Sequence, residues 1–213
     1  APDIIHGQHH LDTMTALLHF TQTPAISYCH GWLPWQEAPL QFPRILHYVA
    51  VDEVSRDRLR FEGGIPDSKI SLLFNAVDTT RFKPRPSLPH RVQRALVLSN
   101  NASDENYAGV IREACDKRNI SLELIGQKAG RSFAYLEQEL GKYDLIFAKG
   151  RSAAEALAVG CAVIVSDIPG AGAMITTQNI EWIRRQNFGL RAMNSAHTVE
   201  HYLAEIEKFN STD

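Results

Sequence analysis

Cysteine is scarce in this chain of 213 residues, and the three that occur show no CxxC spacing. An odd number of cysteines without paired spacing predicts neither a disulfide framework nor a cysteine-rich zinc site. Cys29, Cys115 and Cys161 each lie in an apolar segment. We therefore expect buried, reduced thiols in a cytoplasmic protein.

An excess of charge of one sign is also missing. The 22 lysines and arginines nearly balance the 24 aspartates and glutamates, which leaves a net charge of -2. Because nucleic-acid binders present a basic footprint, we expect no nucleic-acid partner. No apolar run approaches the roughly 20 residues of a membrane-spanning helix, and the first residues show no signal-peptide pattern.

Histidine, by contrast, is concentrated at the start of the chain. Six of the nine histidines lie within the first 47 residues: His6, His9, His10, His19, His30 and His47. Imidazole is a common metal ligand, but no HExxH motif and no paired carboxylates accompany these histidines. We therefore expect no metal site, and we expect His6 and His19 to serve packing.

Short apolar runs alternate with amphipathic segments, which predicts an α/β fold of parallel strands joined by crossover helices. The near-continuous apolarity of the runs indicates sheets covered on both faces. The expected strands are Asp3–His6, Pro24–Cys29, Tyr48–Val51, Lys69–Phe74, Arg94–Leu98, Ser121–Ile125, Asp144–Ala148 and Ala162–Val165. The expected helices lie around Leu11–Leu18, over Glu53–Glu62, from Asp104 to Cys115, over Ser132–Leu140, over Ser152–Val159 and around Val199–Ile206.

A proline-rich segment interrupts this alternation. Phe82–His90 reads FKPRPSLPH, with three prolines among nine residues. Proline fixes φ and disfavours a helix in the residue before it, so the segment should be an extended, stiff connector. We place a domain boundary here, between residues 1–84 and 85–213. Two Rossmann-like lobes of this kind bind ligands at the carboxyl ends of their strands, in the cleft between the lobes.

The stretch Phe147–Gly160 is suited to holding an anion. A buried strand runs into a helix through a turn that contains Lys149, Gly150, Arg151 and Ser152. Free N–H groups at the helix start, the helix dipole and two cations all favour negative charge. An alternative is that the two cations are solvated surface charges. Ser152 and Glu155 also match a capping box, in which Glu155 would bond to its own helix.

Five stretches, in their order along the chain, carry a family resemblance. They read PDIIH, PAISYCHGW, VAVDEVSRDRL, GIPDSKISLLFNAVDTTRF and GRSAAEALAVGCAVIVSD. They resemble the motifs of nucleotide-sugar glycosyltransferases of the GT-B fold, most closely those of glycosyltransferase family 4, over nearly the whole chain. The resemblance implies two Rossmann-type lobes with parallel sheets. The first lobe would be incomplete, because the family's first βαβ part with its glycine-rich loop is missing, so the chain resembles an amino-terminally truncated member.

The resemblance implies a function as well. Such an enzyme moves a sugar from a nucleoside-diphosphate sugar to an acceptor, with retention of configuration, without a metal and without a cofactor beyond the donor substrate. A helix dipole and cations would stabilise the leaving diphosphate. The acceptor would be a glycan, a lipid or a small molecule. Peripheral membrane contact would run through the missing part of the first lobe, and we expect the truncated chain to be inactive alone.

Donor-binding residues follow from the matching positions. Glu155 would bind ribose, and the diphosphate would lie against Lys149, Gly150, Arg151 and Ser152. Phosphate or sugar would also meet Ser99, Asn100, Asn101 and Gly126. Two departures stand out: Phe147 replaces an earlier family glutamate, and Ser99–Asn101 replaces the usual arginine and lysine. Lys149 and Arg151 then become candidate replacement cations.

Catalytic and acceptor residues are expected in the first lobe. The family histidine after the first motif matches Gln8, so a shift of one residue would bring His9 to the reacting carbon, with His10 beside it. His30, at the end of the next strand, would face the same cleft. Trp32 and Trp35 would offer aromatic faces to an acceptor, although they could equally pack their loop onto the lobe. Glu37 is expected to be solvated, and the alternative is that it orients an acceptor hydroxyl.

Two rival functions remain open at this point. The lost glutamate and cations would also suit a non-catalytic nucleotide- or glycan-binding module of GT-B fold. A nucleotide-sugar epimerase of similar two-lobed architecture is the other alternative.

Overall fold

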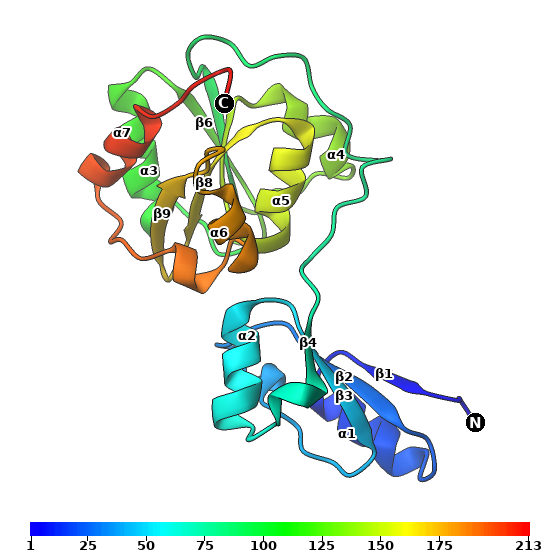
Figure 1. Cartoon of the computed structure of the whole chain (residues 1–213). Helices are drawn as coiled ribbons and strands as arrows, with labels where there is room; N and C mark the ends of the chain where they lie inside the picture. The colour runs from blue at the N-terminus through cyan, green and yellow to red at the C-terminus, as the bar shows by residue number, and fades with distance from the viewer. The chain divides into compact units, whose positions relative to one another are not determined.

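The computed structural model describes all 213 residues and divides the chain into two compact units, Ala1–Phe74 and Asn75–Asp213 (Figure 1). The proline-rich segment begins after this division. Its first residue, Phe82, is buried in a core of the second unit, and the Arg85 N–H donates to the Val159 carbonyl oxygen at 2.7 Å. No helix in either unit is both long enough and apolar enough to cross a membrane.

The first unit contains a four-stranded parallel sheet in the order β1-β2-β3-β4. The strands are β1 (Ile5–Gly7), β2 (Ala25–Cys29), β3 (Ile45–Ala50) and β4 (Ile70–Leu72). The helices are α1 (His10–His19), the short α2 (Glu53–Asp57) with its π-helical continuation η2 (Arg58–Glu62), and the 3-10 turns η1 (Trp35–Glu37) and η3 (Asp67–Lys69). Leu17 from α1 and Leu59 from η2 pack with the strands in one core.

The second unit contains a five-stranded sheet in the order β6-β5-β7-β8-β9. The strands are β5 (Arg94–Leu98), β6 (Ser121–Ile125), β7 (Leu145–Ala148), β8 (Ala162–Asp167) and β9 (Gly170–Met174). All neighbouring pairs are parallel except β8 and β9, which are antiparallel. The α/β fold with parallel-dominated sheets is therefore confirmed, and β9 is an addition to the expected strands.

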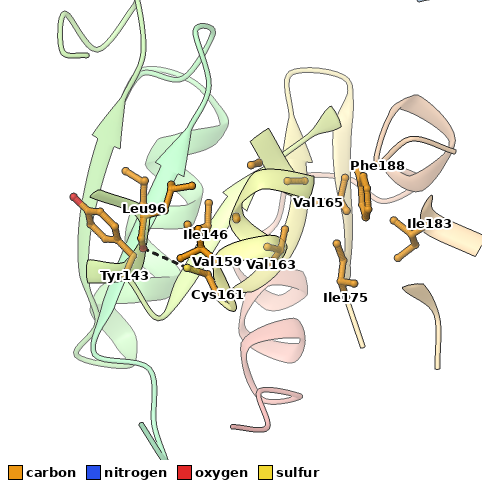
Figure 2. Close-up of a cluster of buried hydrophobic side chains, with 14 of the residues drawn as sticks. Leu96, Tyr143, Ile146, Val159, Cys161, Val163, Val165, Ile175, Ile183 and Phe188 are labelled. Atoms are coloured by element: carbon orange, nitrogen blue, oxygen red, sulfur yellow. Dashed lines mark hydrogen bonds between the residues drawn. The ribbon is translucent and has the colours of Figure 1, made fainter. Parts of the chain in front are cut away.

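Helices cover both faces of the second sheet, as the apolar runs indicated (Figure 1). They are α3 (Tyr107–Lys117), α4 (Leu136–Glu139), α5 (Gly150–Val159), α6 (Ile180–Arg185) and α7 (Val199–Ile206), with 3-10 turns η4 (Leu140–Lys142) and η5 (Leu190–Ala192). Strand β7 shows the alternation: Ile146 belongs to the core cluster that contains Val159 of α5 (Figure 2), whereas Phe147 belongs to the cluster formed with α3 and α7. Phe147, at the position of the family glutamate, is thus a fully buried core residue.

Two expected helices begin later than the sequence predicts. The Asn106 side chain caps α3 by accepting from the Ala108 N–H at 3.3 Å, so Asp104 and Glu105 lie before the helix and not in its first turn. The helix expected from Ser132 begins at Leu136 and has four residues. Capping decides the first of these starts, because the N-cap side chain satisfies N–H groups that have no partner inside the helix.

Candidate functional site

Loops at the carboxyl ends of four parallel strands meet at one edge of the second sheet. Ser99 follows β5, Gly126 follows β6, Lys149 follows β7, and β8 ends at Asp167. Parallel strands present these ends together. Residues predicted for donor binding are therefore gathered from three separate loops, beside an aspartate that the sequence analysis did not select.

Asp167 connects these loops. The side chain is completely buried, and its Oδ2 atom lies 2.5 Å from Nζ of Lys149. Its Oδ1 atom accepts a hydrogen bond from Oγ of Ser99 at 3.0 Å. The Asn101 side-chain amide and the Tyr107 hydroxyl approach the same carboxyl group at 3.5 and 3.4 Å. Three residues expected to bind the donor thus converge on one carboxylate.

The surroundings of Asp167 keep it ionised. Burial by itself would raise the pKa of this carboxyl group, but the hydrogen bond and positive charge of Lys149, aided by the Ser99 hydroxyl, hold the pKa below its usual value. The pair therefore exists as carboxylate and ammonium. Lys149 is an ion-paired cation in this structure and not a free surface charge.

The loops after β5 and β6 approach each other closely at Gly126. This glycine has a φ of 149°, and a Cβ atom placed on it would lie 2.0 Å from the Ser99 carbonyl oxygen. Oδ1 of Asn100 accepts from the Gln127 N–H at 3.3 Å, and the Asn100 carbonyl oxygen accepts from the Lys128 N–H at 3.2 Å. No other residue type allows so close an approach of the two backbones.

A pocket of about 440 Å³ lies at this edge of the second unit. Its apolar lining comes from Leu98, Ile125, Phe133 and Leu136, and its polar lining from Asn100, Gln127, Arg131 and Ser132. The volume falls in the range of ordinary small-molecule sites, roughly 300–1,000 Å³. Apolar walls with a few polar groups suit a flat ring that carries hydrogen-bonding edges.

The turn into α5 differs from the capping-box alternative. The helix begins at Gly150 with Lys149 as its N-cap residue, and no side chain caps it. Ser152 is therefore inside the helix, and the capping-box interpretation is wrong. Glu155 instead accepts a hydrogen bond from Nε of Arg151 at 2.7 Å; its side chain is 7% exposed and that of Arg151 is 69% exposed. The Gly150 N–H is occupied as well, since it donates to the Phe188 carbonyl oxygen at 2.9 Å.

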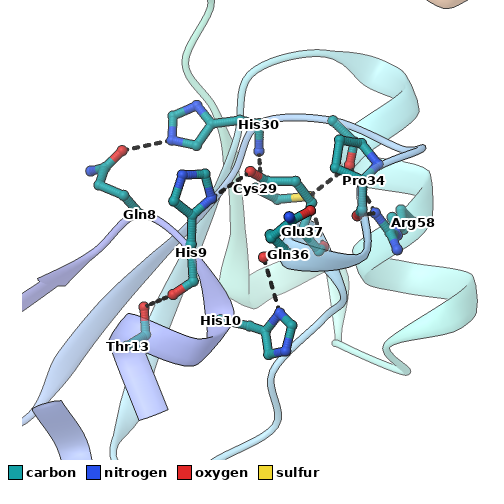
Figure 3. A network of polar contacts seen from close by, with 11 residues as sticks. Gln8, His9, His10, Thr13, Cys29, His30, Pro34, Gln36, Glu37 and Arg58 are labelled. Carbon is teal, nitrogen blue, oxygen red and sulfur yellow. Dashed lines mark hydrogen bonds and ion pairs between the residues drawn. The ribbon is translucent and has the colours of Figure 1, made fainter. Parts of the chain in front are cut away.

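A second polar cluster lies at the carboxyl edge of the first unit's sheet, and Figure 3 shows it around Glu37. Oε1 of Glu37 lies 2.9 Å from Nδ1 of His9, and Oε2 accepts from the His30 N–H at 2.8 Å. The Glu37 side chain is 4% exposed. The expectation that Glu37 is solvated is wrong, because it is held between segments that follow β1 and β2.

The neighbouring histidines belong to the same cluster (Figure 3). The ring centroids of His9 and His30 lie 6.2 Å apart. Nε2 of His30 lies 2.6 Å from Oε1 of Gln8, and Nε2 of Gln8 lies 2.8 Å from Nε2 of His6. The two predicted catalytic histidines are thus brought together, and His6 takes part in a polar chain in addition to its edge-on contact with Tyr28.

The tryptophan loop presents its rings to solvent. Trp32 is 40% and Trp35 is 60% exposed. Trp35 meets the His10 ring edge to face, with centroids 5.6 Å apart. Beneath the loop, the buried Arg58 guanidinium donates to the carbonyl oxygens of Gly31 and Pro34 at 3.1 and 3.0 Å. The loop backbone is therefore anchored while its large rings stay accessible.

Comparison with known proteins shows two similarities. Residues 1–81 match the sequence model of Glycosyltransferase Family 4. A crystal structure of a glycosyltransferase from Rickettsia africae ESF-5 is similar, with a TM-score of 0.59 and 15% sequence identity over 98% of this chain and 78% of that chain. At this identity the structural similarity shows a shared fold, and the family match covers the amino-terminal 81 residues. No protein of curated function matches it.

Possible metal ligands and cysteines are the remaining reactive groups of this chain. No group of three or more histidine, cysteine, aspartate or glutamate side chains is arranged to hold a metal ion. The three cysteines are buried and unpaired, as expected. Burial raises the pKa of Cys29 and Cys161 to about 11, so their thiols are protonated and poor nucleophiles at neutral pH.

Proposed function

We propose that this chain is a glycosyltransferase, which moves a sugar from a nucleoside-diphosphate sugar to an acceptor, with retention and without a metal ion. One observation carries the donor assignment. Ser99, Gly126 and Lys149 come from three loops and converge with Asp167 at the carboxyl edge of the second sheet, beside a pocket of about 440 Å³. The family resemblance is the support for retention.

Different portions of this edge suit the nucleobase, the ribose and the diphosphate of the donor. The apolar pocket walls suit a nucleobase, with Asn100 and Gln127 offering amide groups to its edge. The buried Glu155 carboxylate suits a ribose hydroxyl, because an ionised carboxylate accepts strong hydrogen bonds. Arg151 covers Glu155 here, but its exposed side chain is free to turn toward phosphate.

Leaving-group stabilisation needs no metal in this proposal. The ten-residue helix α5 directs the positive end of its dipole toward the Lys149–Arg151 turn. Lys149, Arg151 and this helix end would together balance the charge that develops on the departing diphosphate. Ser99, Asn100 and Asn101 would add hydrogen-bond donors in place of the family's cations.

The acceptor is assigned to the first unit. His9 and His30 would act at the reacting carbon, and His10, Trp32 and Trp35 would hold the acceptor. Exposed aromatic rings bind the C–H faces of sugars and the chains of lipids alike, so a glycan, a lipid and a small molecule all remain within this proposal.

Calorimetric titration with UDP-, GDP- and ADP-sugars in the presence of EDTA tests the donor assignment. We expect one sugar nucleotide to bind with 1:1 stoichiometry despite the chelator, and NMR of the product formed with an acceptor to show the donor's anomeric configuration. Binding without transfer or donor hydrolysis by the complete gene product would indicate a binding module. A changed sugar stereocentre without acceptor would indicate an epimerase. Loss of binding with EDTA would contradict metal independence.

A further inference from the structure

Glu37 is bonded to two segments of the first unit that carry its candidate catalytic histidines. One carboxylate oxygen meets the His9 side chain at 2.9 Å, and the other meets the His30 backbone N–H at 2.8 Å. With 4% of the side chain exposed, water can replace neither partner without rearrangement. A carboxylate is rarely buried in this way unless it is paired and hydrogen-bonded.

The backbone of His9 is fixed independently of its side chain. His9 is the N-cap residue of α1, with extended dihedral angles, and its carbonyl oxygen accepts from the Thr13 hydroxyl at 2.6 Å and from the Thr13 N–H at 3.0 Å. Helix α1 therefore holds the residue in place. The remaining freedom of His9 lies in its side-chain torsions and in which ring nitrogen carries the proton, and both are restricted by Glu37.

The contact with Glu37 determines which tautomer the neutral His9 ring adopts. An ionised carboxylate is an acceptor only, so Nδ1 of His9 must carry the hydrogen of the 2.9 Å contact. In the neutral imidazole the other nitrogen, Nε2, is then the one with a free lone pair. The His9 side chain is 50% exposed, so this nitrogen is accessible to a ligand.

We propose that Glu37 is a positioning residue, which orients His9 and, in the neutral ring, places the proton on Nδ1 and the free lone pair on Nε2 for the transfer reaction. This inference rests on the proposed function, in which His9 acts at the reacting carbon. The second oxygen of Glu37 ties the His30 backbone to the same carboxylate, so one side chain sets the spacing of both histidines. Arg58 supports the arrangement from below by anchoring the loop between His30 and Glu37.

The first test is the tautomer itself, measured in the unsubstituted chain. Long-range ¹H–¹⁵N correlation spectra of the histidine rings, with His9 assigned through the His9→Gln variant, should show neutral His9 as the Nδ1–H form. An Nε2–H form would overturn the proposal. This arm needs no sugar transfer, so it stands apart from the proposed function.

The second test is Glu37→Gln, which keeps the shape of the side chain. If the amide oxygen still accepts from the His30 N–H, the amide nitrogen faces His9 and donates to Nδ1. The single ring proton of neutral His9 then lies on Nε2. We expect this tautomer exchange together with a fall in kcat of about 10- to 100-fold, while KM for the donor is unchanged. Thermal unfolding of the variant checks that it folds.

Asp67→Asn is the matched control, since Asp67 is a half-exposed carboxylate of the same unit that pairs with Arg56 and Arg60 and not with a histidine. It should leave the His9 tautomer and kcat unchanged. An exchanged tautomer with unaltered kcat in Glu37→Gln would overturn the positioning role. If no sugar nucleotide binds in the calorimetric titration, the proposed function fails, while the two spectra still decide whether Glu37 sets the tautomer.

Discussion

Nζ of Lys149 lies 2.5 Å from Oδ2 of Asp167, a carboxyl group with no exposed surface at the end of β8. The lysine itself is 44% exposed, so one member of the pair is fixed and the other can still reach solvent. A phosphate that approaches Lys149 therefore meets a cation that is already paired with Asp167. Asp167 holds the lysine at the carboxyl edge of the sheet before any donor arrives.

Replacing the buried acid should weaken folding. Asp167→Ala removes the acceptor used by Lys149, Ser99 and Tyr107, and the buried Tyr107 hydroxyl is left without this partner, which is costly. We expect the free energy of unfolding to fall by about 3 kcal/mol, measured by urea denaturation. The control is Asp104→Ala, whose 61% exposed carboxylate pairs with Arg112. This control should cost about 0.5 kcal/mol, and equal losses in the two variants would contradict the prediction.

The same carboxyl group should make stability depend on pH. Folding lowers the pKa of Asp167, because the bond to Lys149 and the other donors outweigh burial. Its contribution to stability is therefore complete above the unfolded pKa of about 3.9 and is lost as pH falls through that value toward the folded pKa. Between pH 5 and pH 3, the free energy of unfolding should fall more steeply in the unsubstituted protein than in Asp167→Asn. Parallel curves would contradict this prediction.

Gly126 offers a test of the close contact between the β5 and β6 loops. In Gly126→Ala, the new methyl group would lie 2.0 Å from the Ser99 carbonyl oxygen, so backbone must move. We expect a loss of about 3 kcal/mol of unfolding free energy and weaker nucleotide binding. Gly130→Ala is the control, because Gly130 also has a positive φ but has no atom within 4 Å of the added Cβ. It should cost about 1 kcal/mol.

Much of the fold follows from local sequence pattern. Strands such as Arg94–Leu98 and Ser121–Ile125 are apolar runs with clear boundaries, and the structure has them where the sequence predicts. Strand β9 is not predicted from the sequence, because its GAGAM sequence contains small residues in place of β-branched ones. Its glycines serve close packing: a Cβ atom on Gly172 would lie 2.2 Å from the Ala192 carbonyl oxygen. Ala192 is distant from Gly172 in sequence, so no local pattern predicts this contact.

The candidate site is predictable to a smaller extent, for a related reason. Motifs give Lys149 and Ser99, but Asp167 acquires its role through partners such as Ser99, which is 68 residues away in the chain. In the sequence Asp167 is visible only as a polar residue after an apolar run. Glu37 looks like a loop residue until β1 and β2 bring His9 and His30 to it. Burial of such carboxylates depends on tertiary contacts, which one sequence does not reveal.

Arg151 tests the diphosphate assignment. Arg151→Ala removes an exposed cation from the first turn of α5 and should weaken binding of the nucleoside-diphosphate sugar by at least about 10-fold, since charge-assisted bonds to phosphate are strong. Calorimetry measures the affinity. Arg118→Ala is the matched control, because Arg118 follows α3 near the amino end of β6, at the opposite edge of the sheet. Equal affinity in Arg151→Ala and the unsubstituted protein would show that the phosphate site is wrong.

Trp35 tests the acceptor assignment. Its ring is 60% exposed, so Trp35→Ala should leave the free energy of unfolding within about 0.5 kcal/mol of the original value. If the ring binds the acceptor, its removal should raise KM for the acceptor by about 10-fold while KM for the donor stays constant. Trp182→Ala is the control, because Trp182 is a 51% exposed tryptophan on α6 of the second unit. Steady-state kinetics that change equally in both variants, or in neither, would remove Trp35 from the acceptor site.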